Sequence, residues 1–187
     1  MNVIEAIEQR RSIRAYTERP VEKDVLEKLV GLAVKAPTGS GMEPWGFVVL
    51  QDKKEIDALS ERIKQKVLNN LADYPQLAQY ESWLRNEKYH VFYHAGTVLI
   101  IYGDTASYWN VYDCSLVAGN VMLAAESEGL GCCWIGFAEA LFNDVDFKKA
   151  HNVPDNFHLV STLTMGYTKV AVPPCTRKPP FFFSWTN

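Results

Sequence analysis

Three arginines and a serine lie within five positions near the start of the chain. They are Arg10, Arg11, Ser12 and Arg14, in the stretch EQRRSIRAY. Arg10 and Arg14 share a side whether this segment is helical or extended, but only an extended segment adds Ser12 to that side. Guanidinium groups donate paired hydrogen bonds and match a phosphate monoester, which carries nearly two negative charges. The spacing favours an anion site, although the same cations could equally offset the negative C-terminal end of a first helix.

A second pair of cations, Arg177 and Lys178, lies near the other end of the chain in TRKPP. Either side chain could close the same anion site if the tail folds back. No G-x-x-x-x-G-K-[ST] sequence is present, and the glycine cluster GLGCC does not match the G-x-G-x-x-G of dinucleotide sites. The polyphosphate nucleotides held by these motifs are therefore disfavoured. A flavin mononucleotide, FMN, fits better, because it has one phosphate, a polar ribityl chain and a flat ring.

Histidine and cysteine pairs elsewhere have structural interpretations. His90 and His94 are four positions apart, which can suit zinc, but the glutamate of H-E-x-x-H is missing and we expect no metal site. Cys132 and Cys133 are adjacent in an expected strand, so their side chains face opposite ways. Buried small side chains are favoured over a redox pair there.

Aromatic residues crowd the polar segment 69–93. They are Tyr74, Tyr80, Trp83, Tyr89, Phe92 and Tyr93. We favour a cover that packs on the core, and the alternative is an aromatic substrate pocket or a dimer contact. The apolar tail FFFSW is expected to pack on a partner subunit.

Composition bounds the class of protein. The 187 residues are 48% hydrophobic and 22% charged, as in globular proteins, and fit one domain over residues 1–187. The net charge of -3 disfavours a nucleic-acid or membrane-surface role. No apolar run approaches the roughly 20 residues of a membrane helix, and the first residues do not resemble a signal peptide. Because the cysteines form neither zinc-type pairs nor a disulfide framework, we expect free thiols and a cytoplasmic protein.

The elements that would position these residues alternate without regular βαβ spacing. Helices are expected from a cap at Asn2 to near Arg10, at 24–35, around 56–67, at 111–128 and at 138–149. Strands are expected at 47–50, 97–102, 132–137 and 158–167. This order favours an α+β fold over a doubly wound sheet.

Five stretches together resemble the nitroreductase family of FMN-dependent oxidoreductases over nearly the whole chain. In order, they read RRSIRAY, APTGSGMEPWGFVV, GLGCCWIGF, VPDNFHLVSTLTMGY and RKP. The resemblance implies a central, mostly antiparallel sheet flanked by helices. It also implies a homodimer of domain-swapped type with FMN at the subunit interface.

The resemblance further implies roles for individual residues. The FMN phosphate and ribityl chain would be held by Arg10, Arg11, Ser12 and Arg14, and the C-terminal phosphate contacts would be Arg177 and Lys178. The loop that borders the isoalloxazine ring, partly from the partner subunit, would be Pro37, Thr38, Gly39 and Ser40. The strand end that covers one ring face, with backbone N–H groups directed at the N5 edge, would be Trp134, Ile135 and Gly136.

Two loop positions depart from the family pattern. Gly41 and Glu43 stand where the family usually carries Asn and Gln, and the strand end reads WIGF rather than WIGGF. Gly41 lacks the amide contact to the ring, and Glu43 accepts hydrogen bonds but donates none unless it is protonated. These changes bear on substrate choice more than on flavin binding. We expect Gly41, Glu43 and Tyr89 to face the substrate.

The chemistry implied by the resemblance needs few catalytic side chains, and no triad or carboxylate pair stands out. NAD(P)H would deliver a hydride to flavin N5 and leave, and an electron-poor acceptor (a nitroaromatic, a quinone or an enone) would then take its place. The alternative is a flavoprotein without turnover, either a flavin carrier or a redox sensor, which the departures at Gly41 and Glu43 keep open. Reductive dehalogenation is a narrower possibility within the family.

Overall fold

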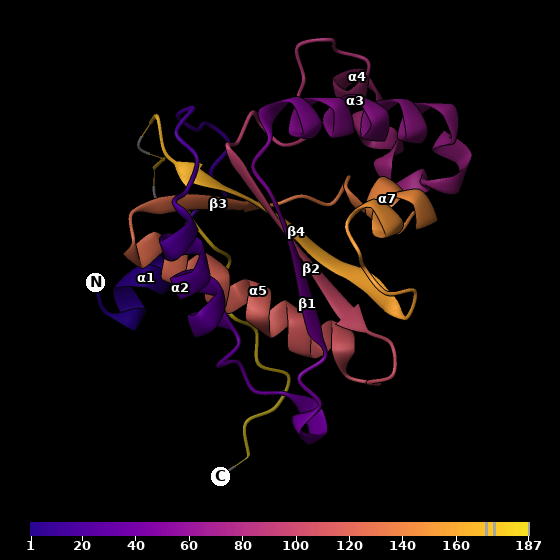
Figure 1. The fold of residues 1–187 in the computed structure, drawn as a ribbon. Coiled ribbons are helices and arrows are strands. Elements are labelled where there is room, and N and C mark those ends of the chain that lie inside the picture. Colours follow the sequence, from indigo (N-terminus) through magenta and orange to yellow (C-terminus); the bar gives the residue numbers. More distant parts are fainter. Residues whose placement is uncertain (171, 174, 187) are drawn as a thin grey trace.

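Within the described residues, four strands form one antiparallel sheet in the order β1-β2-β4-β3 (Figure 1). Their bounds are Trp45–Leu50 for β1, Thr97–Asp104 for β2, Leu130–Trp134 for β3 and Phe157–Tyr167 for β4. The computed structural model describes residues 1–170, 172–173 and 175–186. The predicted α+β fold with an antiparallel sheet is confirmed.

Helices cover both faces of this sheet (Figure 1). The α-helices are α1 Val3–Gln9, α2 Lys23–Ala33, α3 Lys53–Asn69, α4 Glu81–Leu84, α5 Asn110–Ser127, α6 Glu139–Phe142 and α7 Val145–Ala150. Three short 3₁₀ turns complete the set: η1 Gly39–Gly41, η2 Leu71–Asp73 and η3 Pro75–Tyr80. Among the described residues, no helix has the length and apolar character to cross a bilayer.

Side-chain alternation along β2 explains the two layers. Ile100 and Tyr102 pack into a core with α3, α4 and α6, whereas Leu99 and Ile101 pack into a second core with α2 and α5. Successive strand residues point to opposite faces, so a strand buried on both faces is apolar throughout. The run TVLIIY therefore marks the centre of the sheet.

The first helix ends where the arginine cluster begins. Asn2 caps α1 in a reciprocal arrangement with Glu5, as the sequence suggested for the cap. Arg10 then takes an extended conformation, with φ -52° and ψ 132°. Ser12 bridges to Cys132 in parallel, and the Ile13 N–H donates to the Cys132 carbonyl at 2.9 Å. Residues 10–14 thus lie extended beside β3.

One sequence expectation needs correction. The helix predicted over 138–149 is interrupted between α6 and α7, because Asn143 Oδ1 accepts the Leu159 N–H at 2.8 Å and Asp144 is extended. Ile4 and Ile7 on α1 are 65% and 57% exposed. The aromatic side chains of the extended tail are also exposed over the described residues, Phe183 by 96%.

Candidate functional site

The extended backbone after α1 directs alternate side chains to one side of β3. Arg10 and Ser12 line a cavity of about 400 Å³ with Trp134 and apolar side chains of α1 and α5. Arg14, the next residue in this alternation, lines an adjacent cavity. We call Arg10, Ser12 and Arg14 the donor row. The structure therefore adopts the extended arrangement in which Ser12 joins the two arginines.

The second cavity has a volume of about 630 Å³ and is rich in aromatic side chains. Several lining residues come from the segment before β2, and one lies three positions after the end of β3: Leu77, Tyr80, Trp83 and Tyr93, with Phe137. The other lining residues are Arg14 and, at the end of β3, Cys133, Trp134, Ile135 and Gly136. Because Trp134 lines both cavities, they adjoin along the donor row.

Side chains of the aromatic segment contribute both to a cavity wall and to the core. Tyr80 lies at 5.4 Å from Trp83 and 5.5 Å from Phe137, measured between ring centroids, and all three line the cavity. Phe92 instead stacks on Phe142 in the core at 6.0 Å. Tyr89, expected to face the substrate, packs behind the wall against Phe137 at 6.2 Å and is not a lining residue.

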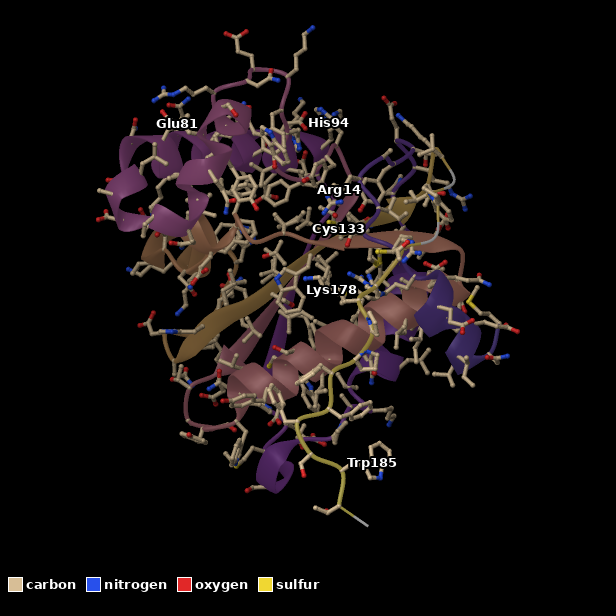
Figure 2. The ribbon with its side chains drawn as sticks, turned by 180° about the vertical axis from the view of Figure 1, so that it is seen from behind. Arg14, Glu81, His94, Cys133, Lys178 and Trp185 are labelled. Carbon is tan, nitrogen blue, oxygen red and sulfur yellow. The ribbon has the colours of Figure 1, made fainter. Side chains whose placement is uncertain are left out.

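Charge in the larger cavity is concentrated at Arg14. Figure 2 shows Arg14 beside Cys133, with His94 above them and Lys178 below. Partial burial opposes the charge on Arg14, but the neighbouring Cys133 and Tyr93 raise its pKa, so the guanidinium stays protonated. Burial raises the pKa of the Cys133 thiol, although Arg14 and the Ser12 hydroxyl act against that shift. The cavity therefore holds a fixed cation and a neutral thiol.

Arg11 lies apart from the donor row. Its Nε donates to the Pro173 carbonyl at 2.9 Å, and its side chain lines a different cavity, of about 360 Å³, with Glu8 and Thr168. This is the consequence of the period of two in an extended segment, which sends residues 10 and 11 to opposite sides. Arg177 and Lys178 are exposed on the extended tail and line neither cavity of the donor row.

Most backbone N–H groups at the end of β3 already have a hydrogen-bond acceptor. The Ile135 N–H donates to the Thr162 carbonyl at 2.8 Å, so it is committed to the sheet. Gly136 is exposed, and no acceptor for its N–H is found among the described residues. Of Trp134, Ile135 and Gly136, Trp134 pairs with Leu163 in the sheet and Ile135 is bonded to Thr162, so Gly136 has the available N–H among the described residues.

The loop Pro37–Glu43 lies at the opposite end of the molecule from the donor row (Figure 1, purple turn at the bottom). Its Gly39 N–H donates to both carboxylate oxygens of Asp113, at 3.0 and 3.1 Å, and Trp109 fills the space that a Cβ on Gly39 would need. Thr38 and Ser40 flank this contact, while Gly41 and Glu43 are exposed with φ of +64° and +50°. None of the loop residues lines either cavity of the donor row.

Asp113 and Trp109 are functional candidates that the sequence reasoning missed. The available signal was an acidic residue in the first turn of α5, a helix whose other buried residues are small or apolar. Asp113 itself is only 4% exposed.

Removing the Asp113 carboxylate should loosen the loop. We expect Asp113→Ala to lower the free energy of unfolding by about 1–3 kcal/mol, because the Gly39 N–H loses its charged acceptor. Asp113→Asn keeps one acceptor oxygen and should lose clearly less. Urea unfolding with hydrogen exchange at the Gly39 amide checks this. Equal losses for the two variants would show that the acceptor is not what matters.

One group of side chains among the described residues has a spacing that could suit a metal ion. It consists of Asp57, His90 and His94, whose ligand atoms lie within 4.8 Å of one another. His90 Nδ1 accepts the backbone N–H groups of Phe92 and His94, at 3.1 and 3.2 Å. In the neutral ring the proton therefore sits on Nε2, which donates to Asp57 at 3.2 Å. Hydrogen bonds account for this group, and the sequence prediction of no metal site stays a prediction.

The burial of His90 should make stability depend on pH. Burial first, and then His94, lower its pKa from 6.5 to about 4, so the folded protein favours the neutral ring. The unfolded chain binds this proton at higher pH than the folded chain does. The contribution, about 3 kcal/mol, is therefore present above pH 6.5 and is lost as pH falls towards 4.

Urea unfolding between pH 4 and 7 measures this effect. We expect His90→Gln to flatten the pH dependence of the unfolding free energy in that window. His94 and His151 are retained in both proteins and serve as internal controls. An unchanged slope would contradict the assignment.

Comparisons with known proteins point to one family. A sequence model of the nitroreductase family matches residues 7–167. A protein of Methanothermobacter thermautotrophicus, provisionally named an NADH dehydrogenase/NAD(P)H nitroreductase, is 26% identical, and the match covers 89% of this chain and 78% of that protein. An iodotyrosine deiodinase of Thermotoga neapolitana is 24% identical, over 85% of this chain and 84% of that protein. The crystal structure of a nitroreductase with bound FMN from Bacteroides fragilis matches with a TM-score of 0.86 and 26% identity, over 100% of both chains.

Proposed function

The chain belongs to the nitroreductase family, and we propose that it is an FMN-dependent oxidoreductase. In this proposal NAD(P)H reduces the bound flavin, and an electron-poor acceptor is reduced in a second, separate step. The observation that carries the proposal is the donor row, which runs along two adjoining cavities. The Bacteroides fragilis nitroreductase with bound FMN supports it.

The residues present fit the cofactor. Arg10 and Ser12 are donors in the smaller cavity, where they would hold the phosphate and the ribityl chain. The larger cavity offers flat aromatic walls and one cation, Arg14, which suit the isoalloxazine ring. Trp134, Ile135 and Gly136 would cover one ring face. When bound, FMN supplies the hydride chemistry, and the protein supplies position and electrostatics.

A second subunit would complete the site. The loop from Pro37 to Glu43 lies too far from its own donor row, so it would border the ring in the partner's site. The exposed apolar face of α1 and the tail with Phe181, Phe182, Phe183 and Trp185 offer surfaces for such a dimer. Arg177 and Lys178, carried on that tail, would add phosphate contacts. Gly41 and Glu43 would then face the acceptor.

The acceptor site favours flat molecules. Among the described residues that line the larger cavity, none carries a carboxylate, and half are aromatic. Nitroaromatics and quinones stack well on such walls, and their reduction needs an open ring face rather than a catalytic triad. NAD(P)H as the donor is supported by the name of the Methanothermobacter relative.

Reductive dehalogenation is a second candidate. It is favoured by the iodotyrosine deiodinase relative, which matches 85% of this chain. A flavin carrier or redox sensor without turnover remains the rival from another class.

One anaerobic experiment separates these functions. The purified protein is loaded with FMN, mixed with NADH or NADPH, and followed by the visible absorbance of oxidised flavin. Bleaching within seconds, reversed by a nitroaromatic or a quinone, supports the proposed enzyme. Reversal by 3-iodotyrosine alone, with release of iodide, supports the dehalogenase. Absorbance that persists for many minutes with either nucleotide supports the carrier or sensor.

A further inference from the structure

The turn that precedes β2 holds a strained backbone. Tyr93 and His94 are consecutive residues with φ of +53° and +54°. Side chains with a Cβ disfavour this left-handed region, and such residues persist where surrounding contacts fix them. The positive φ values indicate that surrounding contacts fix the backbone conformation of this turn.

His90 supplies the contacts that fix this turn. Its carbonyl accepts the Tyr93 N–H at 2.9 Å, and its Nδ1 accepts the His94 N–H at 3.2 Å. Its Nε2 in turn donates to Asp57 on α3, at 3.2 Å. The hydrogen bonds of His90 thus anchor the turn to a long helix.

The turn directs Tyr93, and not His94, into the site. Tyr93 lines the 630 Å³ cavity, whereas His94 is exposed. The Tyr93 ring is supported by Tyr89 in an edge-to-face contact, at 6.1 Å between centroids. The Arg14 guanidinium lies over the Tyr93 ring, 5.7 Å from its centroid. A hydroxyl donor and a fixed cation therefore stand together at one side of the cavity.

These two groups would distinguish between the redox states of a flavin. Two-electron reduction that adds a single proton leaves the flavin with one negative charge, beside the N1–C2 carbonyl edge. Oriented donors stabilise a charge that develops near them, and they act more strongly where water is partly excluded. Arg14 supplies the cation, and Tyr93, whose ring lies 5.7 Å from the guanidinium, supplies a neutral hydroxyl donor on the cavity wall.

We propose that the Tyr93 hydroxyl, beside Arg14, binds the reduced, anionic flavin more tightly than the oxidised flavin and so raises its reduction potential. This inference rests on the proposed function. Tyr93 then acts on the cofactor, and the His90–Asp57 pair positions it. The turn strain, the anchoring and the place of Tyr93 on the cavity wall are all explained by this role.

The test compares Tyr93→Phe with Tyr80→Phe, since both tyrosines line the same cavity but only Tyr93 contacts Arg14. Affinity for oxidised FMN is measured by calorimetry, and the midpoint potential by equilibration with a reference dye. Tyr93→Phe should change the affinity for oxidised FMN by less than about twofold. It should lower the ratio of the affinity for reduced FMN to the affinity for oxidised FMN about tenfold. This change lowers the midpoint potential of the bound flavin by about 30 mV for a two-electron couple. Tyr80→Phe should leave the potential unchanged.

The outcomes are distinguishable. Equal potentials in Tyr93→Phe and the wild type, with FMN bound in both, would overturn this inference and leave the proposed function standing. A wild-type protein that binds no FMN would overturn both. Tyr93→Gln restores a donor without the phenol, and partial recovery of the potential would support the hydrogen bond over a packing effect. A potential as low as that of Tyr93→Phe would contradict it.

Discussion

Arg10→Ala is expected to weaken FMN binding by about 10–100-fold, because a hydrogen bond to a charged group contributes about 1.5–3 kcal/mol. Arg10 stands in the smaller cavity beside Ser12, where the phosphate would be held. Calorimetric titration with FMN measures the change. Since Arg10 is partly exposed, the variant should fold normally.

Arg11→Ala is the matched control for this variant. It removes the same charge at the next position, but from the opposite side of the segment. We expect the FMN affinity of Arg11→Ala to stay within about threefold of the wild type, as long-range charge effects are screened by salt. Equal losses for the two variants would mean that net charge, and not the donor row, governs binding.

Gly131→Ala is expected to displace the donor row. A Cβ at this position would stand 2.6 Å from the buried Ile13 side chain, which lies between Ser12 and Arg14 in the sequence. Overpacking of this kind lowers the free energy of unfolding by about 1–3 kcal/mol. The segment should also shift away from β3, so FMN affinity should fall at least about tenfold.

A double-mutant cycle tests the steric cause. In the Gly131→Ala background, Ile13→Gly removes every clashing side-chain atom, the Cβ at 2.7 Å included. The combined loss should therefore be smaller than the sum of the single losses by at least about 1 kcal/mol. Gly31→Ala is the control, since a Cβ there meets nothing within 4 Å and alanine favours a helix. Additive losses in the cycle would contradict the proposed contact.

The sequence predicted the elements better than their long-range contacts. The apolar run of β2 and the small-residue helix α5 were recognisable because their patterns are local and strong. The two short helices after β3 were merged into one, because the break depends on Asn143 bonding to a residue 16 positions away. Helical periodicity carries no information about such a contact.

The candidate site was only partly predictable, because its arrangement also depends on contacts between residues that are far apart in sequence. The residue types of the donor row indicated an anion, but its conformation depends on the bridge between Ser12 and Cys132, which are far apart in sequence. That bridge separates Arg11 from its neighbours. The contact between Gly39 and Asp113, 74 positions apart, was equally invisible. The Tyr93 turn could not be foreseen, since left-handed backbone at a tyrosine has no local signature.

The affinity ratio of FMN to riboflavin tests the central claim most directly, since the two ligands differ only in the phosphate. If Arg10 and Ser12 bind that phosphate, FMN should bind about 100-fold more tightly than riboflavin. Arg10→Ala should then remove most of the difference in affinity between the two ligands. Equal affinities for the two ligands in the wild-type protein, or no binding of either, would contradict the account.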